Sequence, residues 1–174
     1  VWVVWTFDGL FVIVAVQLVM AGFEGRMVGG GAVYRVAVLV PLYNEDPDVV
    51  VRMLSALLNQ TSPPAEIHVV DDGSTQGAYL EERDWFIRQA AMARIYATWQ
   101  RTANEGKRHA QIHGFRKIRD ADLFVTVDSD SMLDAEALHE IVQPFSDPRV
   151  MSVAGVILAI NNRENLLARV TDVI

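Results

Sequence analysis

Short apolar runs rich in β-branched residues alternate with stretches of helical periodicity from residue 36 onward. Strands that alternate with helices form βαβ units around a mainly parallel sheet. The sequence therefore predicts an α/β fold. The expected strands are 36–40, 67–70, 95–98, 123–127 and 150–160, and the expected helices are 47–58, 80–93, 107–118, 134–145 and a last one from Asn162.

Several residues are expected to set the ends and faces of these elements. Pro41 is expected to end the first strand, because proline cannot donate to a ladder. Asp46 or Asp48 can cap the first helix, and Asp134 can cap the fourth. In the third helix the expected core-facing residues are Ala110, Ile112 and Phe115.

Residues 1–23 are almost entirely apolar, with Asp8 as the main charged exception. About 20 such residues span a bilayer, so a transmembrane helix is predicted, with a buried core helix or a signal peptide as alternatives. Arg26 and Arg35 follow, and basic residues favour the cytoplasmic side. The expected domains are a transmembrane helix over 1–24, a linker over 25–34 and an α/β domain over 35–174, incomplete at its C-terminal end.

Composition excludes some classes of site. The 174 residues include no cysteine, so neither a disulfide nor a thiolate metal site is available. The net charge is -7, and acidic and basic residues are interleaved. A nucleic-acid surface needs clustered basic residues, so no nucleic-acid partner is expected.

Polar clusters follow three of the predicted strands directly. They are Tyr43-Asn44-Glu45-Asp46, Asp71-Asp72-Gly73-Ser74 and Asp128-Ser129-Asp130. Ligands of parallel α/β sheets bind at the carboxyl ends of the strands. The three clusters are therefore expected to contribute to one site.

Asp128 and Asp130 are separated by one residue, so in extended backbone both would point to the same side. Two carboxylates can share a hard cation such as Mg²⁺ or Mn²⁺, which often bridges to substrate phosphates. Such a cation would neutralise charge that grows on a diphosphate leaving group. The alternative interpretation is a solvated turn before a helix.

Two further groups of residues, the carboxylates Asp71 and Asp72 and the basic pair Lys107 and Arg108, could bind a nucleotide. A carboxylate at Asp71 or Asp72 can accept a hydrogen bond from a uracil N–H or a ribose hydroxyl, or can close an Asx turn. Lys107 and Arg108 open a helix whose N-terminus favours anions, so they can bind phosphates, or form a solvated basic turn.

The order of the motifs Pro41-Leu42-Tyr43-Asn44-Glu45, Asp71-Asp72-Gly73-Ser74, Gly106-Lys107-Arg108 and Asp128-Ser129-Asp130 resembles the family 2 inverting glycosyltransferases, from Tyr34 to the end. Residues 43–48, 106–108, 127–134 and 147–150 look like hyaluronan synthases and the related chitooligosaccharide synthases. The resemblance implies a GT-A nucleotide-sugar-binding domain of a plasma-membrane polymerase. Such an enzyme would extend a polysaccharide from a UDP-sugar on the cytoplasmic side.

The same resemblance implies roles for single residues. Tyr43, Glu45 and Asp72 would hold the uridine, and Lys107 would lie near the uridine or diphosphate. Asp71 would either join them or brace the turn. The implied donor-binding residues are Pro41, Tyr43, Glu45, Asp71, Asp72, Lys107, Arg108 and Asp128, and the implied ligands of Mg²⁺ or Mn²⁺ are Asp130, as the main one, and Asp128.

The sequence differs from the family pattern in two ways, which bear on the donor sugar and on the catalytic base. Val156 follows Gly155 where animal-type hyaluronan synthases carry an aspartate, and Asn161-Asn162-Arg163 resembles the chitooligosaccharide group, so UDP-GlcNAc is the favoured donor. The family's general base and its Gln-x-x-Arg-Trp motif do not occur before Ile174, so the catalytic base is expected beyond it and this fragment alone is expected to be inactive. The other expected partners are a polysaccharide acceptor and membrane lipid.

The sequence also allows other functions. The chain could be a non-processive family 2 transferase acting on a lipid phosphate, or a nucleotide-binding module without transfer activity. A sugar-nucleotide pyrophosphorylase would need a glycine-rich loop after the first strand, where Pro41-Leu42-Tyr43-Asn44 stands instead.

Overall fold

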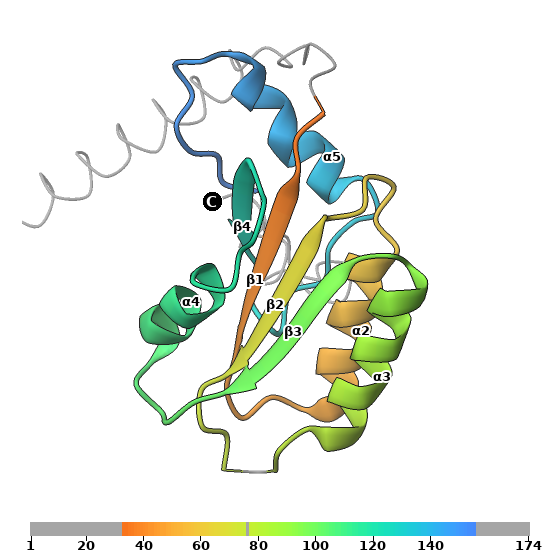
Figure 1. Ribbon diagram of the computed structural model, residues 1–174, viewed down its shortest axis with the longest axis vertical. Helices are drawn as coiled ribbons and strands as arrows, with labels where there is room; N and C mark the ends of the chain where they lie inside the picture. The colour runs from red at the N-terminus through yellow and green to blue at the C-terminus, as the bar shows by residue number, and fades with distance from the viewer. Residues whose placement is uncertain (1–32, 76, 156–174) are drawn as a thin grey trace, which may run out of the picture.

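The computed structural model describes residues 33–75 and 77–155, which form an α/β domain around one sheet (Figure 1). Its four strands are parallel and lie in the order β3-β2-β1-β4. They are β1 (Val36–Leu42), β2 (Glu66–Asp71), β3 (Tyr96–Arg101) and β4 (Leu123–Thr126). The predicted α/β class and parallel pairing are confirmed.

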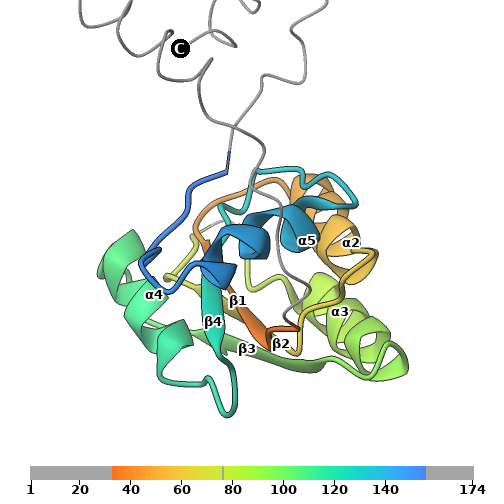
Figure 2. The ribbon, with the colours of Figure 1, turned by 90° about the horizontal axis from the view of Figure 1, so that it is seen from above.

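Helices cover both faces of the sheet, as Figure 2 shows from above. One face carries α2 (Pro47–Leu58) and α3 (Leu80–Met92), which pack against each other, and α4 (Lys107–Phe115) packs on β1 and β2 from the other face. The short α5 (Ala137–Val142) runs directly into the 3₁₀ turn η1 (Gln143–Ser146).

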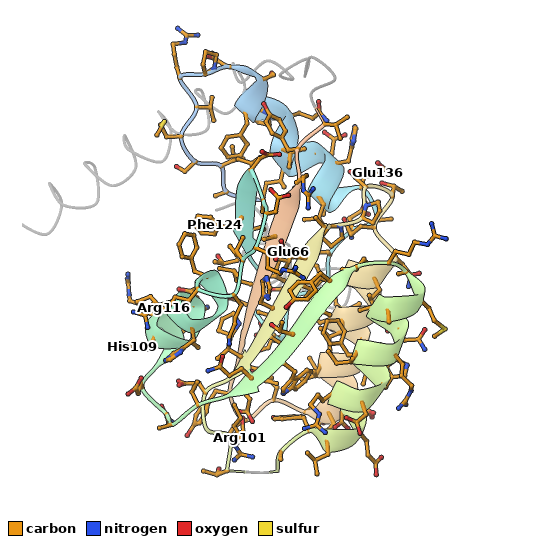
Figure 3. All side chains as sticks on the ribbon, viewed as in Figure 1. Glu66, Arg101, His109, Arg116, Phe124 and Glu136 are labelled. Carbon is orange, nitrogen blue, oxygen red and sulfur yellow. The ribbon has the colours of Figure 1, made fainter. Side chains whose placement is uncertain are left out.

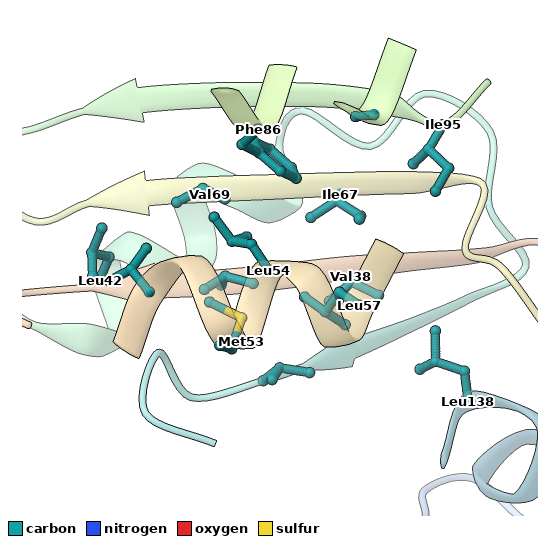
Figure 4. Packing of buried hydrophobic residues seen from close by; sticks show 14 of the residues in the cluster. Val38, Leu42, Met53, Leu54, Leu57, Ile67, Val69, Phe86, Ile95 and Leu138 are labelled. Atoms are coloured by element: carbon teal, nitrogen blue, oxygen red, sulfur yellow. The ribbon is translucent and has the colours of Figure 1, made fainter. Parts of the chain in front are cut away.

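The main core lies between the sheet and α2 and α3 (Figure 4). Alternate residues of β1, such as Val38 and Leu42, meet Met53 and Leu54 of α2 there. Burying one such side chain stabilises the fold by about 1.5–3 kcal/mol. The start of α2 is capped by the Asp46 carboxylate, which accepts the backbone N–H of Asp48 at 2.8 Å.

The face of α4 that meets the sheet is made of small residues. Ala110 and Gly114 are buried, and a Cβ on Gly114 would lie 3.3 Å from Leu39 Cδ2. Because the helix sits this close, the larger residues must point away from the sheet. The expectation that Ile112 and Phe115 face inward is therefore wrong, since both are about half exposed.

Pro41 does not end β1, which continues to Leu42. Successive residues of β1 face β2 and β4 in turn, and Leu42 accepts the N–H of Asp72 from the β2 side. Pro41 therefore faces the β4 side, where strand pairing ends at Leu39 and Thr126. At that position the missing N–H of proline breaks no ladder hydrogen bond.

β4 is less buried than its apolar sequence predicts, because it lies at the edge of the described sheet. Its Phe124 is about half exposed and contacts the ring of Phe115 at a centroid distance of 5.1 Å. Figure 3 shows Phe124 on the α4 side of the molecule.

Two further expectations need correction. α5 begins at Ala137 rather than at Asp134, and the Asp134 carboxylate accepts the N–H of Glu136 in the turn that precedes the helix. Residues 150–155 form no strand, although one was expected from Val150 onward.

Within the described residues, none of the helices combines the length and apolar character needed to cross a membrane. The predicted transmembrane segment 1–24, most of the linker 25–34, residues 156–160 and the helix expected from Asn162 lie outside the described residues.

Candidate functional site

A cavity of 280 Å³ lies at the carboxyl ends of the strands. These ends are at the lower side of the sheet in Figure 1, where β1 leads into α2 and β2 into the loop before α3. The cavity is lined by Pro41, Leu42, Tyr43, Glu45, Asp72, Asn104, Gly106, Lys107, Asp128, Ser129 and Asp130.

Asp72 joins β2 to the start of α4. Its side chain is 3% exposed, and its two carboxylate oxygens accept the backbone N–H groups of Glu105 at 3.0 Å and Gly106 at 2.8 Å. A carboxylate has about four lone-pair positions, so acceptor capacity remains for a ligand in the cavity. Asp72 therefore both holds the loop before α4 and lines the cavity.

Gly73 lets two loops approach each other beside Asp72. Its φ is +71°, and a Cβ at this position would lie 2.7 Å from the backbone nitrogen of Asn104. A side chain would therefore push the loops apart as well as strain the backbone. The close approach is what brings Asn104 to the cavity.

Asp71 is fully buried and does not line the cavity. One of its oxygens accepts the N–H of Ser74 at 2.9 Å, and the other lies 3.5 Å from Arg101 Nε. Arg101, labelled at this end of the sheet in Figure 3, also donates to the Ser74 carbonyl at 2.5 Å. In this structure Asp71 braces the turn, which is one of the two roles left open by the sequence.

The loop after β1 is fastened to the loop after β2. Asn44, with a φ of +52°, donates its backbone N–H to Ser74 Oγ at 2.9 Å and accepts the N–H of Thr75 at 2.7 Å. The Tyr79 hydroxyl donates to the Glu45 carbonyl at 2.7 Å. Burial raises the pKa of Tyr79, which keeps its phenol protonated as that donor.

Glu45 also reaches across the cavity, because its carboxylate accepts a hydrogen bond from Ser129 Oγ at 3.2 Å. Tyr43 beside it also lines the cavity and is 43% exposed. The β1 and β4 loops therefore meet through side chains that both line the cavity.

The cationic and anionic groups of the cavity are partly exposed. Lys107 Nζ lies 2.6 Å from an oxygen of Asp128, with the two side chains 56% and 46% exposed. Asp130 lines the same cavity and is exposed, whereas Arg108 is exposed but outside the lining.

Among the residues that the structure describes, no group of three or more His, Asp or Glu side chains could hold a metal ion by itself. A cation at Asp128 and Asp130 would need further oxygens from a ligand. That donor set fits Mg²⁺ or Mn²⁺, because Mg²⁺ commonly binds one or two carboxylates together with substrate phosphates.

Four cavity residues were not singled out from the sequence: Leu42, Asn104, Gly106 and Ser129. Three of them lie inside the quoted motifs and could have been found from their neighbours. Asn104 gave no such signal, because its position depends on the contact with Gly73.

The chain is similar in sequence to known glycosyltransferases. The family model described as Glycosyl transferase family 2 matches residues 37–173. A hyaluronan synthase of Streptococcus pyogenes is 38% identical over 141 residues, which are 80% of this chain and 33% of that protein. An N-acetylglucosaminyltransferase of Bradyrhizobium diazoefficiens is 33% identical over 144 residues, covering 79% and 28%. The chain thus spans about a third of the length of these relatives.

Solved structures agree on the fold. The mannosyltransferase PcManGT from Pyrobaculum calidifontis, in complex with GDP-Man and Mn²⁺, superimposes with a TM-score of 0.66 at 23% identity, over 80% of this chain and 42% of that one. GalNAc-T7 with UDP, GalNAc and Mn²⁺ gives a TM-score of 0.53 at 22% identity, over 67% and 21%. The α/β domain has the GT-A fold, and the chain belongs to glycosyl transferase family 2.

Proposed function

We propose that this chain is the donor-binding part of a membrane-attached glycosyltransferase that extends a polysaccharide from a UDP-sugar, with UDP-GlcNAc favoured. The observation that carries the proposal is the single cavity that brings together Tyr43, Asp72, Lys107 and the pair Asp128 and Asp130. The names of the relatives, a hyaluronan synthase and an N-acetylglucosaminyltransferase, support this substrate class.

The uridine would bind beside the ends of β1 and β2. The exposed ring of Tyr43 offers an aromatic face on which a base can stack. Asp72 is held rigidly by two backbone N–H groups and keeps lone pairs for a uracil N–H or ribose hydroxyl. Glu45, anchored through Tyr79 and Ser129, can accept a further hydroxyl.

The diphosphate would bind between α4 and the end of β4. Lys107 would exchange its contact with Asp128 for a phosphate oxygen, which its exposure allows. When bound, Mg²⁺ or Mn²⁺ would supply Lewis-acid neutralisation of the leaving diphosphate. Asp130, with Asp128, would hold the ion, and Asp128 would also orient the nucleotide and sugar.

The remaining parts of the proposal concern the whole protein. The base that deprotonates the acceptor hydroxyl would follow Ile174. Residues 1–24 would anchor the enzyme in the plasma membrane with the α/β domain in the cytoplasm. A reporter fused after Ile174 should therefore report a cytoplasmic position, and an external signal would contradict this topology.

The decisive experiment is nucleotide titration of the full-length enzyme by calorimetry, with and without Mn²⁺. UDP should bind more tightly than ADP or GDP, and Asp130→Asn should weaken Mn²⁺-dependent UDP binding by about 10-fold or more, which corresponds to about 1.4 kcal/mol. Asp48→Asn is the matched control, since it removes an exposed carboxylate of α2 outside the cavity. Equal binding of the three nucleotides, or wild-type metal dependence and turnover in Asp130→Asn, would refute the proposal.

A further inference from the structure

The loop between β4 and α5 carries Asp128, Ser129 and Asp130, and within the described residues the pairing of β4 with β1 ends before it, at Thr126. Its entry is fixed by a hydrogen bond from the Val127 N–H to the Leu39 carbonyl at 2.9 Å. The position of the carboxylates therefore depends also on what fixes the exit of the loop.

A buried amide from a distant part of the chain holds that exit. Gln60, just after α2, is 5% exposed. Its Nε2 donates to the Asp134 carbonyl at 2.7 Å and to the Ala56 carbonyl at 3.1 Å, and its Oε1 accepts the N–H of Leu138 at 2.9 Å. Both amide hydrogens and one acceptor position are thus engaged, so the side chain has a single well-defined orientation.

The contact with Leu138 also completes the start of α5. The first N–H groups of a helix have no partner within it, and the N-cap residue Glu136 makes no side-chain capping bond. Gln60 supplies an acceptor from outside the helix. It therefore joins α5 and the preceding loop to the end of α2.

Thr61 adds further hydrogen bonds between the end of α2 and the start of α5. Its backbone N–H donates to the Ala135 carbonyl at 3.0 Å, and its hydroxyl donates to the Glu136 carboxylate at 3.0 Å. Figure 3 labels Glu136 where α5 begins, beside the loop that follows α2. This second contact is at the surface, whereas the Gln60 amide is in the interior.

We infer that Gln60 is a positioning residue for the cation-binding carboxylate Asp130, which it serves by fixing the backbone at Asp134, four residues further along the loop. The inference rests on the proposed function, in which Asp130 holds the ion. Residues that orient metal ligands without touching the metal typically change metal affinity by about 10- to 100-fold when they are removed.

The test uses the full-length enzyme with Gln60→Met, which keeps length and apolar packing but removes every hydrogen bond of the amide. Mn²⁺ affinity in the presence of UDP is measured from the electron paramagnetic resonance signal of free Mn²⁺, and metal-free UDP binding by calorimetry. Mn²⁺ affinity should fall by about 10-fold, while metal-free UDP binding stays within about twofold. Asn59→Ala is the matched control, because the exposed amide of this C-cap residue donates to the Ser55 carbonyl of α2 and makes no other side-chain hydrogen bond in the described part of the chain.

If Gln60→Met fails to fold, Gln60→Glu gives the answer. It keeps an acceptor for the Leu138 N–H but loses the donor to the Asp134 carbonyl, which is the contact that the inference depends on, so Mn²⁺ affinity should again fall by about 10-fold. Wild-type Mn²⁺ affinity in the folded variant would overturn the inference, even if thermal stability fell. Asp130→Asn measured in parallel separates the two proposals: a loss there without a loss at Gln60 overturns only the inference, and no loss at Asp130 overturns both.

Discussion

The carboxyl ends of β2 and β4 both present aspartates at the cavity edge, yet the two ends are built differently. β2 lies inside the described sheet, and the oxygens of its Asp72 accept two backbone N–H groups. β4 lies at the edge, and Asp128 and Asp130 are at least partly exposed, with Asp128 paired to Lys107. The β2 end is thus part of the scaffold, whereas the β4 end has carboxylates that can change partners.

The largest expected effect is the difference in the free energy of unfolding between Asp72→Ala and Asp130→Ala. Asp72→Ala removes two part-buried hydrogen bonds to a charged group, from the N–H groups of Glu105 and Gly106, and each such bond contributes about 1.5–3 kcal/mol. Asp130→Ala removes an exposed side chain and should change the free energy of unfolding by no more than about 0.5 kcal/mol. Thermal unfolding of the two variants measures the difference, and equal losses would mean that the contrast between the two ends is wrong.

A second buried polar group, the pair Glu66 and His68, lies in the first half of β2, where it anchors the loop between α4 and β4. His68 is fully buried, with its Nε2 3.0 Å from the Glu66 carboxylate and its Nδ1 2.8 Å from Thr98 Oγ1. Glu66 also accepts the backbone N–H groups of Arg119 and Asp120. Figure 3 shows Glu66 over the centre of the sheet.

This pair should make the β2 scaffold sensitive to acid. Burial lowers the pKa of His68 more than Glu66 raises it, so below about pH 6.5 the unfolded chain takes up a proton that the fold does not, and stability falls. Burial acts to raise the pKa of Glu66, but its hydrogen bonds to Asp120, Arg119 and His68 outweigh this and leave it lowered. Its contribution is present above the ordinary glutamate pKa and is also lost as the pH falls.

The measurement is the unfolding temperature between pH 7 and pH 5 for the wild type and His68→Gln. Glutamine keeps an N–H donor for Glu66 but does not titrate, so the variant should show a flatter pH dependence over this interval. An equally steep dependence in both proteins would place the acid-sensitive group elsewhere.

The contrast between the two strand ends was only partly visible in the sequence. The periodicity of the apolar residues predicted β1, β2, α2 and α3, because side chains alternate or recur with the period of each element. It could not show that β4 is an edge strand, since strand order depends on long-range pairing. The apolar Leu123–Val127 therefore looked as buried as β1.

Contacts between distant segments explain the other differences. Ile112 and Phe115 were expected in the core, but the face of α4 is chosen by the close packing of Ala110 and Gly114. The motifs identified most of the cavity lining, because they sit directly after strands. Gln60 was not singled out, since its partners Asp134 and Leu138 lie more than seventy residues away.

The smallest expected effect is the coupling energy between Lys107 and Asp128, which form a partly exposed ion pair at the carboxyl end of β4. Exposed ion pairs contribute only about 0–1 kcal/mol to the free energy of unfolding and weaken with salt. A double-mutant cycle with Lys107→Met and Asp128→Asn should therefore give a coupling energy of no more than about 1 kcal/mol. Under the proposed function, the same variants should move metal-free UDP binding in opposite directions: Lys107→Met would remove the proposed phosphate contact, whereas Asp128→Asn would free the ammonium from its competing carboxylate. A coupling energy above about 2 kcal/mol would class this pair with the buried scaffold of β2, because exposed pairs do not reach that value.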